Sequence, residues 1–291
     1  MKKEVGLLHL AVMLFGLAGV IGKFVTLPAI LITFGRVSFS SIFLLIIILI
    51  KKEKVRLSNK KDYILIIAAG IVMALHWFTF LQAIQLSTVA IGTITFSTFP
   101  LFVTFLEPLV YHEELRIKNI MIALTMFAGV IITIPEFSLN NQITLGIFIG
   151  LIGSLSYAVL CLMNRYFAGK YTGRTICLYE QGIAAIILLP SLLIVKASIT
   201  KLDLFALIFL GVICTAVAHS IYVSSLKKVK VQTAGIISGM ESVYSIIFAI
   251  FLLHEIPGVK ELLGGVIILG VAFYATCLLY TSDAADELDG V

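Results

Sequence analysis

Long apolar runs, each about the length needed to cross a lipid bilayer, follow one another through almost the whole chain. A membrane-spanning helix needs about 20 mostly apolar residues. Ten such runs are found, at about residues 5–24, 28–50, 62–82, 88–110, 118–135, 144–167, 174–195, 203–224, 232–253 and 260–280. They lack the apolar–polar alternation of a membrane β-barrel, so they predict helices.

The composition excludes a water-soluble fold. Of the 291 residues, 60% are hydrophobic and 13% are charged, whereas soluble domains carry roughly 25% charged residues. A soluble fold of this size could not hide so much apolar surface. We therefore predict an all-α membrane protein with ten transmembrane helices.

Cysteine spacing and nucleotide motifs give no sign of a cofactor. The four cysteines lie inside apolar runs without CxxC spacing, which argues against disulfides and metal sites. No Walker motif is present, so the chain is not expected to hydrolyse ATP. The first run follows Lys2 and Lys3 but is not followed by a small-residue cleavage site, so we expect it to be a helix and not a signal peptide. We expect no cofactor and no nucleic-acid partner.

Basic residues predict the orientation in the membrane. With the N-terminus in the cytoplasm, the inside segments hold Lys2, Lys3, the cluster from Lys51 to Lys61, Arg116, Lys118, Arg165, Lys170, Arg174, Lys227, Lys228 and Lys230. The outside segments hold only Lys23, Lys196, Lys201 and Lys260. We therefore expect a multi-pass protein of a bacterial-type inner membrane, with both termini cytoplasmic.

The two halves of the chain correspond at an offset of about 141–143 residues. Gly70 matches Gly211, and the dipeptide HE at 112–113 matches HE at 254–255. Because each half holds five spans, the second half must enter the membrane in the opposite orientation, which is an inverted repeat typical of transporters. We expect one repeat at residues 1–137 and the other at 138–280. The acidic tail at 281–291 is expected to be foreign sequence or a disordered native tail.

Several short motifs occur in a familiar order: FGLAGVIGK in the first run, GR at 35–36, Pro100 thirteen residues before Glu113, and a G-x-x-x-x-x-G-V pattern from Gly264 to Val271. In this order and in its duplicated architecture, the chain resembles EamA-type permeases of the drug/metabolite transporter superfamily. The resemblance implies ten helices in two five-helix repeats and export of amino acids or their derivatives, often against a proton gradient. Two departures are that Phe15 precedes Gly16 where the family often has Trp, and that Ser242 replaces the second-half equivalent of Pro100, which leaves a kink there open.

Glu241 is the most informative polar residue. It lies about ten residues into the ninth run, roughly 15 Å deep and near the bilayer midplane. A charge at that depth costs about 2.5–3.5 kcal/mol even on the lenient insertion scale. We expect it to handle substrate or protons, with a structural ion pair as the alternative. Glu107, by contrast, should lie close to the inner interface.

Arg36, in the second run, must pair because it cannot lose its proton. Its counterpart in the seventh run is Glu180. The pair suggests polar anchors between the repeats, or in the case of Arg36 a site for anionic groups. The sequence leaves open whether Arg36 meets Glu241 or Glu180.

His76 and His219 lie at corresponding depths in the third and eighth runs. A buried imidazole needs partners, so each is expected in an interhelical hydrogen bond or in a cavity, where it could carry protons. Trp77, together with Phe78, Phe80, Tyr157, Tyr222 and Tyr244, is a candidate lining of an apolar cavity, although aromatic side chains also commonly face lipid.

Small and hydroxyl residues gather on the fourth and ninth runs, in AIGTITFSTFP and TAGIISGMES. Thr95 and Ser238 are the candidates among them for binding a substrate. Close helix packing is the commoner reason for such residues.

These features predict a secondary transporter for small organic metabolites that works by alternating access; protons are the candidate coupling ion, and the identity of that ion stays open. The expected partners are a small-molecule substrate, protons and the lipid bilayer; substrate, direction and oligomeric state stay open. An intramembrane enzyme using Ser238 and His219 is the alternative. It is weakened by the absence of a G-x-S-x-G elbow and an H-E-x-x-H motif, so we expect no enzyme activity.

Overall fold

A computed structural model describes residues 2–111, 117–134, 140–225 and 231–288, and within these ranges it is built from helices without strands. The helices are α1 (Lys2–Phe24), α2 (Ala29–Ile50), α3 (Lys60–Leu86), α4 (Val89–Phe96), α5 (Phe99–Tyr111), α6 (Ile117–Thr133), α7 (Gln142–Ala168), α8 (Gly173–Leu188), α9 (Ser191–Ile194), α10 (Lys201–Gly211), α11 (Ala218–Ser225), α12 (Val231–Leu253) and α13 (Val259–Leu288). A π-helical segment, η1 (Val212–Val217), joins α10 to α11. The predicted all-α class is confirmed.

Seven helical stretches within the described residues are long and apolar enough to cross a membrane. Shorter apolar stretches occur in α6, at Ile120–Thr133, and in α12, at Ile237–Leu253. The protein is therefore a multi-pass membrane protein. The exact number of ten spans, the inverted repeat and the cytoplasmic location of the termini stay predictions.

Two of the predicted runs are broken. The run at 88–110 forms α4 and α5, which are separated at Ser97 and Thr98. Pro100 lies in the first turn of α5, where its missing N–H leaves no helical hydrogen bond unmade. The seventh run forms α8 and the short α9, with Pro190 between them. In contrast, α12 continues as one helix through Ser242, so the break after α4 has no counterpart there.

Polar caps begin several of the helices. The Thr88 hydroxyl accepts the N–H of Ile91 at the start of α4, and the Asn141 side chain accepts the N–H of Ile143 at the start of α7. Thr200 and Asp203 form a reciprocal capping box at the start of α10. Each cap satisfies N–H groups that the helix itself cannot pair.

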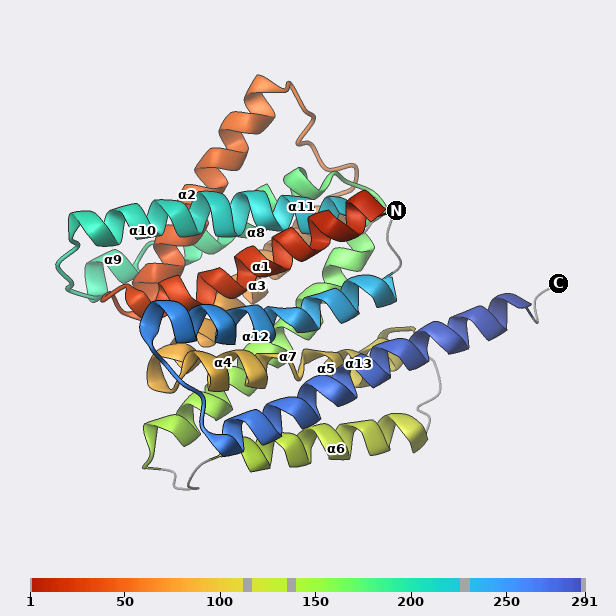
Figure 1. Cartoon of the computed structure of the whole chain (residues 1–291). Helices are drawn as coiled ribbons and strands as arrows, with labels where there is room; N and C mark the ends of the chain where they lie inside the picture. Colours follow the sequence, from red (N-terminus) through yellow and green to blue (C-terminus); the bar gives the residue numbers. More distant parts are fainter. Residues whose placement is uncertain (1, 112–116, 135–139, 226–230, 289–291) are drawn as a thin grey trace.

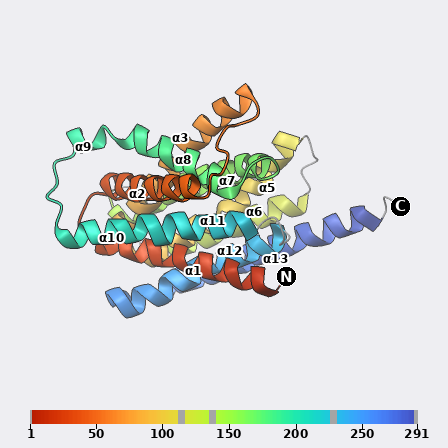
Figure 2. The same cartoon turned by 90° about the horizontal axis from the view of Figure 1, so that it is seen from above.

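The main helix pairs join residues far apart in the chain. α3 packs along α7, α1 along α12, α2 along α8, and α6 along α13. The last pair and the α1–α12 pair are easily followed in Figure 1, and Figure 2 shows the bundle from above, with α13 extending beyond its edge. In every pair one helix precedes residue 138 and the other follows it. The two predicted halves therefore meet along the centre of the molecule.

Gly70 and Gly211 lie at two of these close crossings. A Cβ atom on Gly70 would lie 2.5 Å from Cβ of Ile183 in α8. A Cβ atom on Gly211 would lie 2.6 Å from Cβ of Phe39 and 2.8 Å from the carbonyl oxygen of Arg36 in α2. Glycine at these positions allows backbones to approach to distances that other residues prevent.

We expect Gly70→Ala and Gly211→Ala each to destabilise the fold by about 1–3 kcal/mol, the usual range for overpacking. Gly182→Ala in α8 is the matched control, because its Cβ would meet only Ser41 at 4.0 Å. Alanine should stabilise the helix at that position by up to about 1 kcal/mol. Thermal unfolding of the three variants in detergent measures the difference, and equal melting temperatures would contradict the close crossings.

Glu53, in the segment that joins α2 to α3, forms a two-pronged ion pair with Arg174. Hydrogen bonds from the Arg174 guanidinium hold the pKa of Glu53 below its ordinary value of 4.5. A lowered pKa adds stability above pH 4.5, which is lost as the pH falls through the folded-state value. We expect Glu53→Gln to cost up to about 1 kcal/mol at pH 7 and progressively less in acid. Melting temperatures between pH 3 and pH 7 test this, and a difference independent of pH would exclude the linkage.

Candidate functional site

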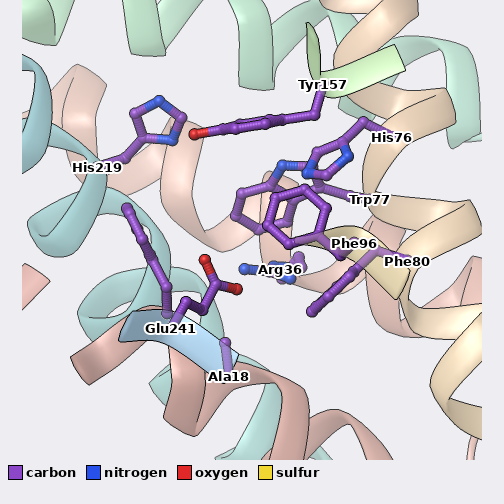
Figure 3. Close-up of a pocket in the computed structure, with 10 residues that line it drawn as sticks. Ala18, Arg36, His76, Trp77, Phe80, Phe96, Tyr157, His219 and Glu241 are labelled. Carbon is purple, nitrogen blue, oxygen red and sulfur yellow. The ribbon is translucent and has the colours of Figure 1, made fainter. Parts of the chain in front are cut away.

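A small cavity lies in the centre of the bundle, where α1, α2, α3, α4, α7, α11 and α12 converge (Figure 3). Its volume is about 40 Å³. The lining residues are Phe15, Ala18, Arg36, His76, Trp77, Phe80, Phe96, Tyr157, His219 and Glu241. A cavity of this size holds a few water molecules. The lining thus combines the charged groups of Arg36 and Glu241, the imidazoles of His76 and His219, and an aromatic wall formed by the remaining rings.

Arg36 is the buried cation of the cavity, with 3% of its surface exposed. Its guanidinium carbon lies 3.0 Å from the centroid of the Trp77 ring, and its Nε donates to the hydroxyl of Thr215 at 3.2 Å. Thr215 is part of η1, and its own hydroxyl donates to the carbonyl of Leu210 at 2.7 Å. A π-helical turn often marks a functional position, and here it places the hydroxyl that orients the arginine.

Glu241 is the buried anion, and its carboxylate points toward the Arg36 guanidinium in Figure 3. Among the ion pairs of the described residues none joins these two groups, so they face each other across the cavity without direct contact. Gly16 of α1 lies against the backbone at Glu241, where an added Cβ would be 3.0 Å from its carbonyl oxygen. This close packing fixes the depth of Glu241.

The choice that the sequence left open is thereby answered: Arg36 faces Glu241, whereas Glu180 lies beside Cys177 and His219. A buried charge is tolerated when an opposite charge or water reaches it. Arg36 and Glu241 therefore present opposite charges to the same cavity.

His76 is held by the backbone of α7. Its Nδ1 lies 3.0 Å from the carbonyl oxygen of Gly153. Because a carbonyl can only accept, Nδ1 carries the hydrogen, and Nε2 is the free acceptor when the ring is neutral. The ring packs against Tyr157 and Phe96, with centroid distances of 4.8 Å and 5.4 Å.

His219 lies at the edge of the cavity, with its ring 6.0 Å from that of Phe15. It is 6% exposed, and its Nδ1 has no hydrogen-bond partner. The other cavity rings pack edge to face: Phe96 lies 5.3 Å from Phe80 and 5.0 Å from Tyr157. Such a wall suits apolar groups and diffuse cations.

The remaining predicted site residues are not among those that line the cavity. The Tyr222 hydroxyl hydrogen-bonds to that of Ser238 at 2.8 Å, and Tyr222 packs behind Phe15 at 5.8 Å. The Tyr244 hydroxyl lies 3.0 Å from Nδ1 of His9. Thr95 is buried in α4, where it lies against Gly150 of α7. These residues support the lining or the packing of the helices around it.

Sequence reasoning missed Phe15, Ala18 and Phe96 as lining residues. Phe15 occupies the position before Gly16 that departs from the usual pattern of the resembled family, and this was the one signal available for it. Glu107 pairs with Arg165 and keeps 22% of its side chain exposed, and its position at the inner interface stays a prediction.

Comparisons with known proteins agree with a transport role. Proteins similar to the chain include an uncharacterised transporter of Archaeoglobus fulgidus, 26% identical over 66% of the chain and 68% of the relative. S-adenosylmethionine uptake transporters of Rickettsia bellii and Rickettsia conorii are 22% and 24% identical, each over 84% of the chain and 82% or 81% of the relative. A crystal structure that is 17% identical in sequence matches the fold with a TM-score of 0.68, and the match covers 96% of this chain and 98% of the chain in the crystal structure. The two proteins therefore share a fold.

The family comparison covers both halves of the chain. The sequence pattern of the EamA-like transporter family matches residues 2–134 and again residues 144–277. Relatives that are named as transporters favour transport over the enzymatic alternative, and a transporter of this kind acts on a small molecule within the membrane. The chain belongs to the EamA-like transporter family.

Proposed function

We propose that the protein is a secondary transporter of small zwitterionic metabolites, amino acids or their derivatives, and that the central cavity is its substrate site. One observation carries this proposal: Arg36 and Glu241 face each other, buried and without direct contact, beside an aromatic wall. The carboxylate of an amino acid would bind Arg36, and its ammonium group would bind Glu241. Trp77, Phe80 and Tyr157 would hold the remainder of the molecule.

The names of the Rickettsia relatives narrow the substrate class. S-adenosylmethionine is an amino acid that carries an aromatic base and a sulfonium cation. The aromatic base could stack on the rings of the aromatic wall, and the sulfonium cation could form a cation–π contact with them. The resemblance implies export, whereas those two relatives are named for uptake. The direction of transport must therefore be measured in the transport assay described below.

The cavity supports a mechanism in which helices move. Ligand pockets usually measure about 300–1,000 Å³, far more than the 40 Å³ found here. A metabolite must therefore displace lining side chains or separate the helices around them. In an alternating-access cycle, this conformation would be the closed state between two open ones.

The helix contacts have counterparts under exchange of the two halves, which supports a mechanism in which one half rocks against the other. Replacing each helix by its predicted counterpart turns the α3–α7 pair into the α11–α1 pair, and both pack. Likewise, Gly70 lies against the carbonyl of Glu180 and Gly211 lies against that of Arg36, the predicted counterpart of Glu180. The inverted repeat and its division near residue 138 are part of this proposal.

Proton coupling would use Glu241. A carboxylate that binds either a proton or the ammonium group of a substrate, but not both, exchanges one for the other as the cavity opens to alternate sides. Orientation with both termini in the cytoplasm would place this exchange across a bacterial-type inner membrane.

Binding is tested directly by the fluorescence of Trp77, the single tryptophan of the chain. Because Trp77 lines the cavity, a bound substrate should change its emission. The panel consists of S-adenosylmethionine, S-adenosylhomocysteine, and aromatic and aliphatic amino acids. Purified protein is titrated with each, and transport of every compound is measured in both directions in sealed proteoliposomes.

We expect the compounds that change Trp77 emission to be those that are transported, and Trp77→Phe to remove the optical signal. Esterification of the carboxylate or acetylation of the amine should abolish binding of an active compound. Equal binding of the blocked and unblocked forms would contradict recognition by Arg36 and Glu241. Transport with no change in Trp77 emission would place the substrate site elsewhere.

A further inference from the structure

A second cluster of chemically active groups lies beside the central cavity. Sγ of Cys177, a carboxylate oxygen of Glu180 and a ring nitrogen of His219 all lie within 4.8 Å of one another. Cys177 and Glu180 are three residues apart on α8 and therefore share one face of that helix, whereas His219 comes from α11. All three residues are buried.

The polar atoms of this cluster are left without partners. Within the described part of the chain, neither carboxylate oxygen of Glu180, which is 0% exposed, makes a hydrogen bond of normal geometry, although the Asn164 side chain lies nearby, and Nδ1 of His219 also lacks a partner there. No ion pair among the described residues includes Glu180. Leaving such groups unpaired in an apolar interior is costly. The cluster is therefore incomplete as it stands, and a cation bound between the three side chains would complete it.

The ligand types select the cation. A thiolate, a carboxylate and an imidazole together favour a borderline-soft divalent ion such as Zn²⁺ over Mg²⁺ or Ca²⁺, which prefer oxygen ligands alone. The charges also balance, because a Cys177 thiolate and a Glu180 carboxylate cancel the two positive charges of the ion. A neutral complex is the form that a low-dielectric interior accepts most readily.

We propose that Cys177, Glu180 and His219 form a binding site for Zn²⁺ or a similar transition-metal ion. Zinc–ligand bonds of about 2.0–2.3 Å require ligand atoms roughly 3–4 Å apart, so shifts of about an ångström or less close the site. His219 also lines the central cavity, which would give the ion a route of entry when the cavity opens and would let water reach the fourth position. A bound ion ties α8 to α11.

Residue spacing along the chain did not predict this site. The cysteines lack CxxC spacing. Cys177 and Glu180 lie in α8, whereas His219 lies in α11, and only folding brings the two helices together. The expectation that the chain has no metal site rested on spacing along the chain, which does not detect ligands contributed by separate helices.

Titration with Co²⁺ tests the proposal on the full-length, tag-free protein in detergent. Cobalt bound by a thiolate gives a charge-transfer absorption band that weakly bound cobalt lacks. We expect one equivalent of Co²⁺ to produce this band and Zn²⁺ to displace it. Loss of an outer-shell partner weakens metal binding about 10–100-fold, so we expect Cys177→Ser and Glu180→Gln, which each remove a direct ligand, to weaken it at least 100-fold.

Cys214→Ser is the matched control, since Cys214 is also a buried free cysteine but lies outside the cluster. It should bind Co²⁺ as the unmodified protein does, and circular dichroism and gel filtration should show that all three variants are folded. The proposal is overturned if no charge-transfer band forms or if the band persists in Cys177→Ser. It is also overturned if the protein binds no metal and infrared spectra show a protonated carboxyl group that Glu180→Gln removes.

Discussion

Glu241→Gln is expected to reduce substrate accumulation in proteoliposomes from about 100-fold to none, under an imposed gradient of about two pH units. One proton exchanged per substrate across such a gradient supplies about 2.7 kcal/mol, which corresponds to a 100-fold concentration ratio. Glutamine keeps the size of the side chain but cannot bind and release a proton. The variant should therefore only equilibrate the substrate.

Binding measured through Trp77 separates coupling from misfolding. We expect Glu241→Gln to weaken substrate binding by about 1.5–3 kcal/mol, the usual contribution of a hydrogen bond to a charged group, and to remove its dependence on pH. Glu53→Gln is the control, because Glu53 pairs with Arg174 outside the cavity. It should accumulate substrate as the unmodified protein does. Accumulation that survives Glu241→Gln would reduce Glu241 to a structural role and point to His76 as the coupling residue.

The helical architecture could be predicted because hydrophobicity along the chain reports directly on the lipid environment. Each predicted run lies largely in helix, although two are broken, and the separation of the third and fourth runs is confirmed by the cap at Thr88. The π-helical turn at Val212–Val217 was not predicted. Within it Thr215 meets Arg36 of α2, a contact that hydropathy does not encode.

The candidate site was only partly predictable, for a similar reason. A charge deep in an apolar run is conspicuous at any position, so Arg36 and Glu241 were found without knowing which helices meet. Depth alone could not place Tyr244, which lies in the same helix as Glu241 but bonds to His9 of α1. Which face of a helix points inward is set by packing with its neighbours. Ordinary apolar residues such as Ala18 and Phe96 carried no signal at all.

Arg36→Gln is the second change with a large expected effect, and it should act on both stability and transport. It removes the stacking on Trp77 and leaves Glu241 without an opposing charge. Breaking a buried charge pair from one side costs about 3–5 kcal/mol. We expect a loss near the lower limit, because the two groups are not in direct contact, together with loss of binding by substrates that carry a carboxylate.

Two companion variants and a control outside the cavity make this result specific. The double variant Arg36→Gln, Glu241→Gln removes both charges, so it should recover most of the lost stability while transport remains absent. Arg36→Lys keeps the charge but loses the flat contact with Trp77 and the orienting bond to Thr215, which should weaken substrate binding about 10–100-fold. Arg174→Lys, outside the cavity, should leave binding unchanged. If the double variant were no more stable than Arg36→Gln alone, the arginine would be held by its aromatic and hydroxyl contacts, and Glu241 would need another partner to explain its burial.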